Sequence, residues 1–128
     1  MIMLLDTNAL HWWLNDPGRL SAIAVKAMEN RSNSIVVSAV VPWELAIKTN
    51  LGKLKSQTLL ANWNAKLAEE GFSELPIDSS HAIRAGLLPQ HHKDPFDRMI
   101  IAQAMVEGMI LVTGDRKLAE YGVPVLLV

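Results

Sequence analysis

IMLLD, the stretch from Ile2 to Asp6, decides the fold class of this chain. Four consecutive apolar residues closed by a carboxylate are typical of a short strand that is buried on both faces. Similar apolar runs cover Ile35 to Val37, Met109 to Val112 and Val125 to Val128. Strands that are apolar on both faces and alternate with helices favour a parallel sheet, so we predict an α/β sandwich with a mostly parallel central sheet.

Helix signals fill the segments between these runs. Asp94 and Pro95 supply a cap and a first-turn proline, and the helix that they open is apolar nearly all round, so we expect it to be central. A turn is expected at Asn15 to Gly18. Helices are expected over Thr7 to Leu14, Ala22 to Glu29, Pro42 to Gly52, Leu59 to Gly71, Ser79 to Gly86, Asp94 to Gly108 and Asp115 to Glu120.

Length and composition narrow the possible classes of protein. The 128 residues suit one domain over residues 1–128, and 50% apolar with 20% charged residues excludes a disordered chain. The absence of cysteine excludes disulfide scaffolds and thiolate chemistry. A net charge of -1 excludes nucleic-acid binding driven by an overall positive charge, although it does not exclude a local basic rim. Without a signal peptide or a membrane-length apolar run, we expect a cytoplasmic chain with no membrane contact.

Four acidic residues occupy positions that this fold can bring together. Asp6 and Asp115 follow two expected strands, while Glu44 and Asp97 lie in the first turns of two helices. Ligands of open parallel sheets bind beyond the carboxyl ends of the strands. Carboxylates gathered there would raise one another's pKa unless a cation joined them, and oxygen ligands suit Mg²⁺ or Mn²⁺. Such an ion could lower the pKa of a water and neutralise phosphoryl charge.

Each acid also has a purely structural interpretation, and the residues alone leave both open. Asp6 and Asp115 are able to cap the helices that follow them. Asp94 three residues before Asp97 resembles a capping box, which makes Asp94 the better cap and leaves both interpretations open for Asp97. Glu44 is four residues before Lys48, the favourable order for a solvated ion pair on a helix.

The same residues resemble the PIN domain, and more narrowly the VapC-type toxins of bacterial and archaeal toxin–antitoxin pairs. The four blocks of the resemblance occur in the family's order along nearly the whole chain. They are LLDTNAL from Leu4, SAVVPWELAIK from Ser38, DPFDRMIIAQA from Asp94 and LVTGD from Leu111.

This resemblance implies a three-layer α/β/α fold and an endoribonuclease that depends on Mg²⁺ or Mn²⁺. It implies an acidic pocket in which Asp6 and Asp97 are the principal metal ligands. Glu44 would bind the metal or its water, and Asp115 would serve a second ion or the outer shell. Asn8 and Thr113 would orient carboxylates or waters. It also implies an RNA substrate, a small antitoxin partner and a homodimer, the last supported by the mean hydropathy of +0.18.

A nuclease that gathers acids needs cations around them for the phosphates of its substrate. Lys93, Arg98, Arg116 and Lys117 flank the acidic positions and are predicted to form this rim. His91 and His92 come just before them, but adjacent histidines point apart, so zinc binding is not favoured.

The four tryptophans have different expected places. Trp13 shares a helical face with Leu10 and is expected in the core. Trp12 lies on another face and is expected at a homodimer or antitoxin surface, with base stacking as a further possibility. Trp43 and Trp63 are expected to be packed.

Other classes fit the sequence less well. A haloacid-dehalogenase-like phosphatase needs a second aspartate two residues after Asp6, where this chain has Asn8. A receiver-like signalling domain needs paired acids there and a late lysine, and neither is evident. A PIN-like fold that only binds a partner stays open as the non-catalytic alternative, against which the four acids argue. P-loop and dinucleotide motifs are absent.

Overall fold

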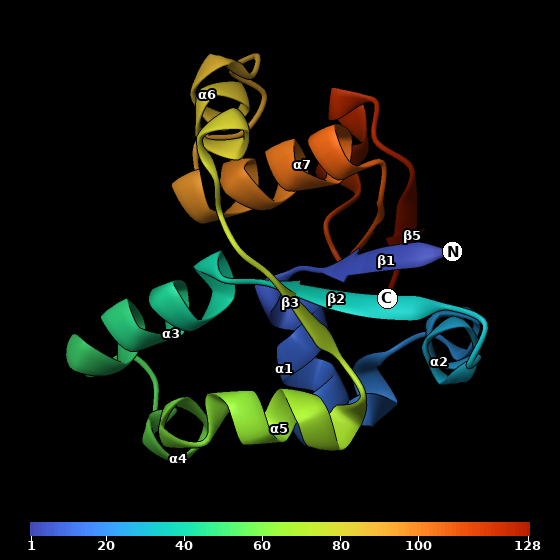
Figure 1. Ribbon diagram of the computed structural model, residues 1–128, viewed down its shortest axis with the longest axis vertical. Helices are drawn as coiled ribbons and strands as arrows, with labels where there is room; N and C mark the ends of the chain where they lie inside the picture. Colours follow the sequence, from blue (N-terminus) through green and yellow to red (C-terminus); the bar gives the residue numbers. More distant parts are fainter.

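β1 (Ile2–Leu5) lies at the centre of a five-stranded sheet in the computed structural model, which describes residues 1–128 (Figure 1). The strand order is β3-β2-β1-β4-β5, and all four neighbouring pairs are parallel. The predicted α/β class with a parallel sheet is therefore confirmed. The other strands are β2 (Ser34–Ser38), β3 (Ser73–Leu75), β4 (Ile110–Thr113) and β5 (Val125–Leu127).

β3 is the strand that sequence reasoning missed. Its three residues, Ser73 to Leu75, are exposed or only partly buried at the edge of the sheet, so they carry no apolar run. An edge strand needs no buried pattern on both faces. The region predicted as one helix from Leu59 to Gly71 is in fact two short helices that meet at Asn62.

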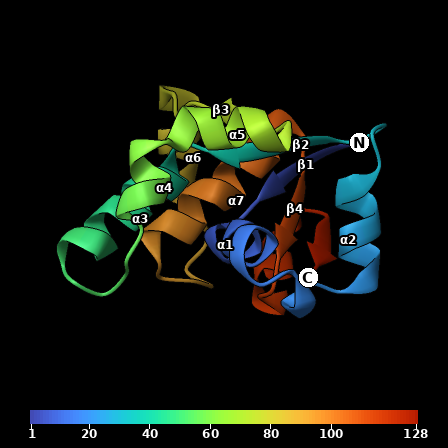
Figure 2. The same ribbon diagram turned by 90° about the horizontal axis from the view of Figure 1, so that it is seen from below.

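Helices cover both faces of the sheet, which makes three layers (Figures 1 and 2). The chain steps from β1 to β2 to β3 in one direction and then returns to the other side of β1 for β4. Right-handed crossovers therefore place the earlier and the later helices on opposite faces. One face carries α1 (Thr7–Asn15), α2 (Ala22–Glu29), α4 (Gln57–Ala61) and α5 (Trp63–Glu70), and the other carries α6 (Ser79–Leu87) and α7 (Pro95–Glu107).

Three shorter or peripheral elements complete the chain. α3 (Val40–Asn50) extends beyond the carboxyl end of β2 (Figure 1). The expected turn after α1 contains the 3₁₀ helix η1 (Pro17–Arg19), and the helix expected from Asp115 is the 3₁₀ helix η2 (Arg116–Tyr121). None of the helices combines the length and the apolar character that crossing a bilayer requires.

The core lies between the sheet and these helices. Met3, Leu4 and Leu5 of β1 have no exposed surface. On α7, Ile100 and Ile101 are equally buried because the helix is covered by the sheet on one side and by α6 on the other. The expectation of a central helix is thus confirmed.

The burial of the tryptophans agrees only in part with the prediction. Trp63 is buried and Trp13 packs against the core, as predicted. The prediction for Trp43 is wrong, because 58% of this residue is exposed. Trp12 is partly covered by its own chain, since its ring lies 4.6 Å from the Arg19 guanidinium and next to Gly114.

Candidate active site

The site lies where the sheet changes its direction of winding, between β1 and β4. Leu5 pairs with Val112 in the parallel register, so the residues that follow them, Asp6 and Thr113, are neighbours. The Asp6 backbone N–H donates to the Val112 carbonyl at 3.0 Å. Such a switch point opens a crevice at the carboxyl ends of the strands, which is where ligands of open α/β sheets bind.

Asp6 is held by both of its carboxylate oxygens. Oδ1 accepts a hydrogen bond from the Ala9 N–H at 2.8 Å and caps α1, and Oδ2 accepts one from Thr113 Oγ1 at 2.5 Å. Only 6% of the residue is exposed. Burial raises the pKa of Asp6 to about 6, although the hydrogen bonds from Thr113 and Ala9 oppose the shift, and the carboxylates of Asp97 and Glu44 add to it.

Asp97 lies in the first turn of α7 and contacts His92, which precedes the helix. Its Oδ2 is 2.8 Å from His92 Nε2. Burial raises the pKa of Asp97, opposed by the hydrogen bond with His92 and reinforced by the Asp94 and Glu44 carboxylates. Asp94 caps α7, as expected, because its Oδ1 accepts from the N–H groups of Phe96 and Asp97 at 2.9 and 3.3 Å.

Glu44 is buried on α3 and uses both oxygens inside the protein. Oε1 accepts from Thr7 Oγ1 at 2.6 Å, and Oε2 receives Lys48 Nζ at 2.5 Å. The ion pair that the sequence offered as an alternative is therefore present. Thr7 and Lys48 were not among the predicted site residues. Their signals were the place of Thr7 directly after Asp6 and the four-residue spacing of Lys48 from Glu44.

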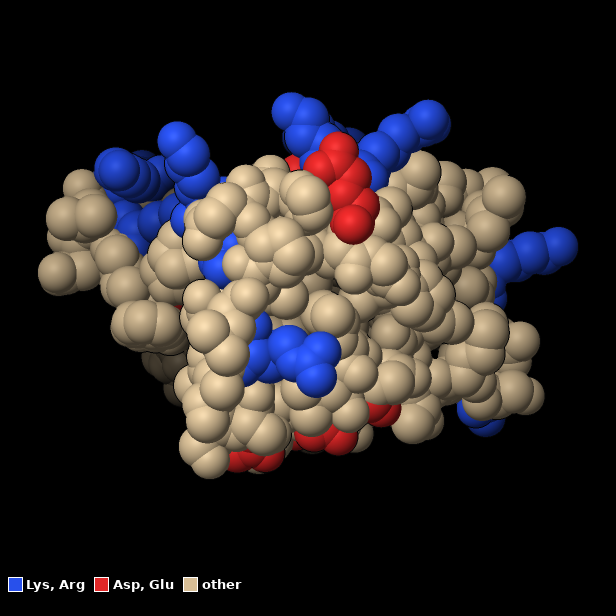
Figure 3. All heavy atoms as spheres, turned by 90° about the horizontal axis from the view of Figure 1, so that it is seen from above, with Lys and Arg blue, Asp and Glu red and all other residues tan.

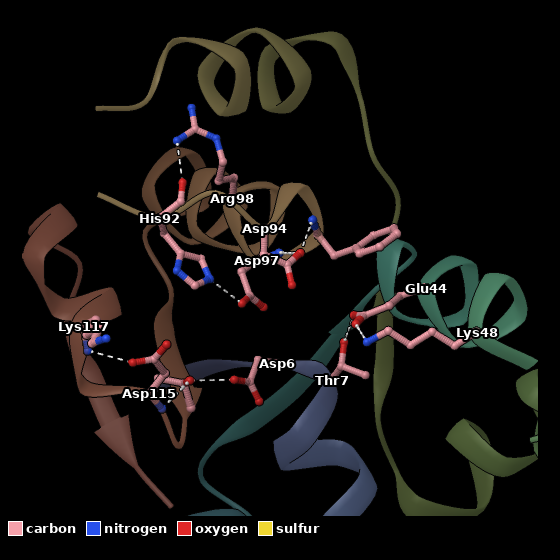
Figure 4. Close-up of polar contacts among 12 residues, drawn as sticks. Asp6, Thr7, Glu44, Lys48, His92, Asp94, Asp97, Arg98, Asp115 and Lys117 are labelled. Carbon is pink, nitrogen blue, oxygen red and sulfur yellow. Dashed lines mark hydrogen bonds and ion pairs between the residues drawn. The ribbon is translucent and has the colours of Figure 1, made fainter. Parts of the chain in front are cut away.

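Asp115 reaches the same crevice from the turn after β4. It caps η2 by accepting the Lys117 N–H at 2.9 Å, and its own N–H donates to Thr113 Oγ1 at 3.0 Å. Figure 4 shows Asp6, Asp97 and Asp115 around a common space, with Glu44 farther along on the α3 side. The fold thus brings the four predicted acids to one end of the sheet.

The donors present fit a hard divalent cation. The buried carboxylate of Asp6 and the partly buried one of Asp97, whose pKa values are raised by burial and by neighbouring carboxylates, gain from a positive charge between them. His92, Asp94 and Asp97 each offer a ligand atom, and these three atoms lie within 4.8 Å of one another. His92 and Asp94 therefore join the predicted acids as residues able to hold or orient an ion.

The predicted basic rim is only partly formed. Lys93, Arg116 and Lys117 are exposed near the acids, and Asn8 is exposed beside Thr7. Figure 3 shows several Lys and Arg side chains along the upper edge of the face seen there, with an acidic side chain between two of them. A chain of nearly zero net charge therefore still has locally basic surface.

Arg98 does not belong to that rim, which corrects its prediction. Only 9% of Arg98 is exposed, because its side chain turns inward between α6 and α7. Its Nη1 donates to the carbonyls of Pro89 and His92, and its Nη2 donates to those of Ala85 and Leu88. Arg98 thus satisfies carbonyls at the end of α6 and anchors the loop that presents His92 to Asp97.

A groove adjoins the acids on the side of α1. It has a volume of about 410 Å³, begins at Thr7 and runs between α1, α3 and α4. Leu10, Leu14 and Leu59 line it together with Lys55 and Lys66. The groove therefore combines apolar walls with positive charge.

Comparison with known proteins agrees with this geometry. The family model described as PIN domain matches residues 3–124. Ribonuclease VapC22 of Mycobacterium tuberculosis (strain ATCC 25618 / H37Rv) is 34% identical over 123 residues, which cover 95% of this chain and 93% of that protein.

Solved structures share the fold at lower identity. VapBC2 from Rickettsia felis, bound to a DNA fragment from its promoter, superposes with a TM-score of 0.73 at 19% identity, covering 99% of this chain and 98% of the other. VapBC-1 from nontypeable Haemophilus influenzae superposes with a TM-score of 0.69 at 20% identity, with the same coverage of 99% and 98%. These likenesses confirm the three-layer fold.

Proposed function

This chain belongs to the PIN domain family, and from that membership we propose that it is an endoribonuclease that hydrolyses RNA phosphodiesters with the help of Mg²⁺ or Mn²⁺. The observation that carries the proposal is that a buried carboxylate, Asp6, and a partly buried one, Asp97, lie close enough to raise the pKa of Asp6 further, while burial raises the pKa of both. The similarity to a protein named ribonuclease over 95% of the chain supports the same activity. The family also argues against the phosphatase and receiver alternatives.

The four acids have different roles in the proposed site. Asp6 and Asp97 would hold the ion, with Asp115 and Glu44 completing the acidic pocket. A divalent ion bound there would lower the pKa of a water molecule and neutralise charge on the phosphodiester. Thr113 fixes the orientation of the Asp6 carboxylate, and His92 does so for Asp97. Residues held in this way need little rearrangement when the ion and the substrate arrive.

Lysine and arginine side chains would neutralise the negative charge of the substrate's phosphates. Lys93, Arg116 and Lys117 are proposed to contact RNA phosphates from the exposed edge of the site. Lys48 balances the buried charge of Glu44, and its side chain is 41% exposed. Asn8, exposed beside Thr7, is proposed to orient water at the site's edge. We propose that residues 1–128 carry out this reaction as a single nuclease domain.

Cleavage of an RNA pool with single-stranded and structured members tests the activity. Wild type, Asp6→Asn and Asp97→Asn are compared in Mg²⁺, Mn²⁺ and EDTA, with Glu29→Gln as a control at an exposed acid of α2. We expect cleavage by wild type and the control in the metal buffers only. We expect loss by two orders of magnitude or more in the two site variants. Activity that survives EDTA or both substitutions would contradict the proposed mechanism.

The biological setting is proposed to be that of a toxin held in check by a small antitoxin in the cytoplasm. The support is the resemblance to Ribonuclease VapC22 and to chains solved as VapBC assemblies. Induction of the wild-type chain should arrest growth, and co-expression of a small protein encoded beside it should restore growth. Asp97→Asn should not arrest growth. Arrest that is equally strong with Asp97→Asn would show that the toxicity does not need the nuclease.

We also propose that the chain forms a homodimer. Apolar side chains such as Ile23, Ile83 and Leu87 are exposed by 71%, 63% and 78%, which leaves surface for protein contacts. Size-exclusion chromatography with light scattering should give twice the chain mass of 14.1 kDa. A monomer at micromolar concentration would contradict the proposal.

A further inference from the structure

Trp43 is an exposed aromatic residue in the first turns of α3 that contacts the first turn of α7. It directly precedes Glu44 on α3, and Phe96 directly precedes Asp97 on α7. The two rings meet edge to face, with centroids 5.3 Å apart and an angle of 81° between their planes. The pair therefore joins the two helices that carry Glu44 and Asp97, one residue before each acid.

The exposure of Trp43 is not explained by packing. Of the four tryptophans, Trp63 is buried and both Trp12 and Trp13 are partly covered, whereas Trp43 is 58% exposed. An edge-to-face contact fixes the orientation of an aromatic ring but covers only part of its surface. Trp43 is thus an indole held in place by Phe96 and still open to a ligand.

We propose that Trp43, held by Phe96, is a stacking platform for one unpaired nucleobase of the RNA beside the phosphodiester that is cleaved. The proposal rests on the proposed ribonuclease function. Aromatic side chains bind single-stranded RNA by stacking because every base has a π face, whereas a base inside a duplex is already stacked and paired. The platform therefore favours single-stranded over duplex substrates.

The surrounding charges suit an RNA strand in this position. Lys48 is on the same helix as Trp43, one turn beyond Glu44, and its ammonium faces the crevice beside Glu44 (Figure 4). Lys93 is exposed just before the helix that carries Phe96. Cations beside an aromatic surface bind the backbone phosphates while the ring takes the base. One nucleotide can then bridge the platform and the acids.

Kinetics with intact and abasic RNA test the platform. The variants are Trp43→Ala, Trp43→Phe and Trp43→Leu, the last of which keeps apolar bulk against Phe96. Leu51→Ala is the matched control, because Leu51 is a 62% exposed apolar residue just beyond the end of α3. The substrates are one single-stranded RNA and the same RNA with an abasic site on either side of the cleaved bond.

We expect Trp43→Ala and Trp43→Leu to raise KM about tenfold, with kcat within about threefold of wild type. Trp43→Phe should fall between them and wild type, and Leu51→Ala should equal wild type. With one of the two abasic RNAs, the KM of wild type should rise by the same factor, whereas the KM of Trp43→Ala should not rise further. That loss of additivity would place the base on the indole.

Three results would overturn the platform while leaving the ribonuclease in place. The first is wild-type kinetics in Trp43→Ala. The second is a rise in KM, relative to wild type on the same RNA, that is as large on abasic RNA as on intact RNA. The third is a change in oligomeric state on light scattering. The last result would assign the indole to a protein interface. If wild type itself shows no metal-dependent cleavage, the proposed function fails and the platform fails with it.

Discussion

Thr113 Oγ1 donates a hydrogen bond to Asp6 Oδ2 at 2.5 Å and joins residues that are 107 positions apart in the sequence. The same hydroxyl oxygen accepts the N–H of Asp115 at 3.0 Å. One fully buried side chain therefore links the end of β1, the end of β4 and the turn that carries Asp115. It sets the relative positions of two of the four acids.

Thr113→Val should weaken both the fold and the activity. Valine keeps the shape but removes the donor to Asp6 and the acceptor for Asp115, which leaves buried polar groups without partners. We expect the free energy of unfolding to fall by about 1–3 kcal/mol. Cleavage should fall by roughly tenfold or more, because orienting groups around metal ligands typically matter by that factor.

Urea unfolding and RNA cleavage measure these two effects. Thr113→Ser is the control, since it keeps the hydroxyl and should retain most of the activity. An active and equally stable valine variant would show that the hydroxyl is dispensable.

Asp6→Asn should stabilise the metal-free protein at neutral pH. The pKa of Asp6 is about 6 in the folded protein, against 3.8 for an unperturbed aspartate side chain, so the folded state binds more protons between these two pH values. Stability therefore falls as the pH rises from about 4 to about 6, and the loss persists above that range. Its size is about 3 kcal/mol at pH 7, from ~1.36 kcal/mol per pKa unit.

Urea unfolding in EDTA at pH 4 and at pH 7 tests this. Asparagine caps a helix as well as aspartate does, so the variant keeps the cap of α1. The variant's advantage over wild type should grow with pH, and Mg²⁺ should stabilise wild type more than the variant. A difference that stays constant with pH would contradict the raised pKa.

Arg98→Lys should destabilise the protein although it preserves the charge. The guanidinium donates to four backbone carbonyls, and a single ammonium cannot reproduce this planar arrangement. We expect a loss of about 2–4 kcal/mol and reduced cleavage, because the loop that holds His92 beside Asp97 loses its anchor.

Thermal unfolding and cleavage assays would show this, with Arg84→Lys as the control at an exposed position of α6. A rim residue would behave differently. Its replacement by lysine would keep the charge, so both stability and the salt dependence of RNA binding would stay nearly unchanged.

Glu44 and Lys48 should be coupled in stability. Lys48→Met leaves a buried carboxylate with Thr7 as its remaining partner, whereas Glu44→Gln removes the charge itself. Lys48 is partly exposed, so we expect a coupling energy of only about 1 kcal/mol in a double-mutant cycle. Chemical unfolding of wild type, both single variants and the double variant measures it. Strictly additive effects would mean that the pair contributes nothing.

Much of the site was predictable because its residues mark the ends of elements. Asp6 closes an apolar run, Asp97 and Asp94 open an apolar helix, and Asp115 follows another apolar run. The parallel order of such elements brings their carboxyl ends to one edge, so local signals made these acids candidates, and the resemblance to the PIN domain selected them. Asp94 was correctly distinguished as the cap of α7 for the same local reason.

The residues that were misplaced depend on neighbours outside their own helices. Arg98 was assigned to the basic rim because it flanks the acidic positions in the sequence, but four carbonyls from the end of α6 and the following loop bind its guanidinium inside the protein. Trp43 was expected to be packed, yet it is 58% exposed and its ring meets that of Phe96 on α7 edge to face. The edge strand β3 lacks the apolar pattern that identified the other strands.

The sequence by itself determined the alternation of buried strands and helices, the caps, and the family to which the acids belong. These features depend on the polarity of a residue and of its near neighbours, which a linear chain displays directly. Tertiary structure alone decided that Thr113 orients Asp6, that Thr7 donates to Glu44, that Arg98 is internal and that Trp43 is exposed. Burial and hydrogen-bond partners are properties of the packed elements, and they appear only when distant segments meet.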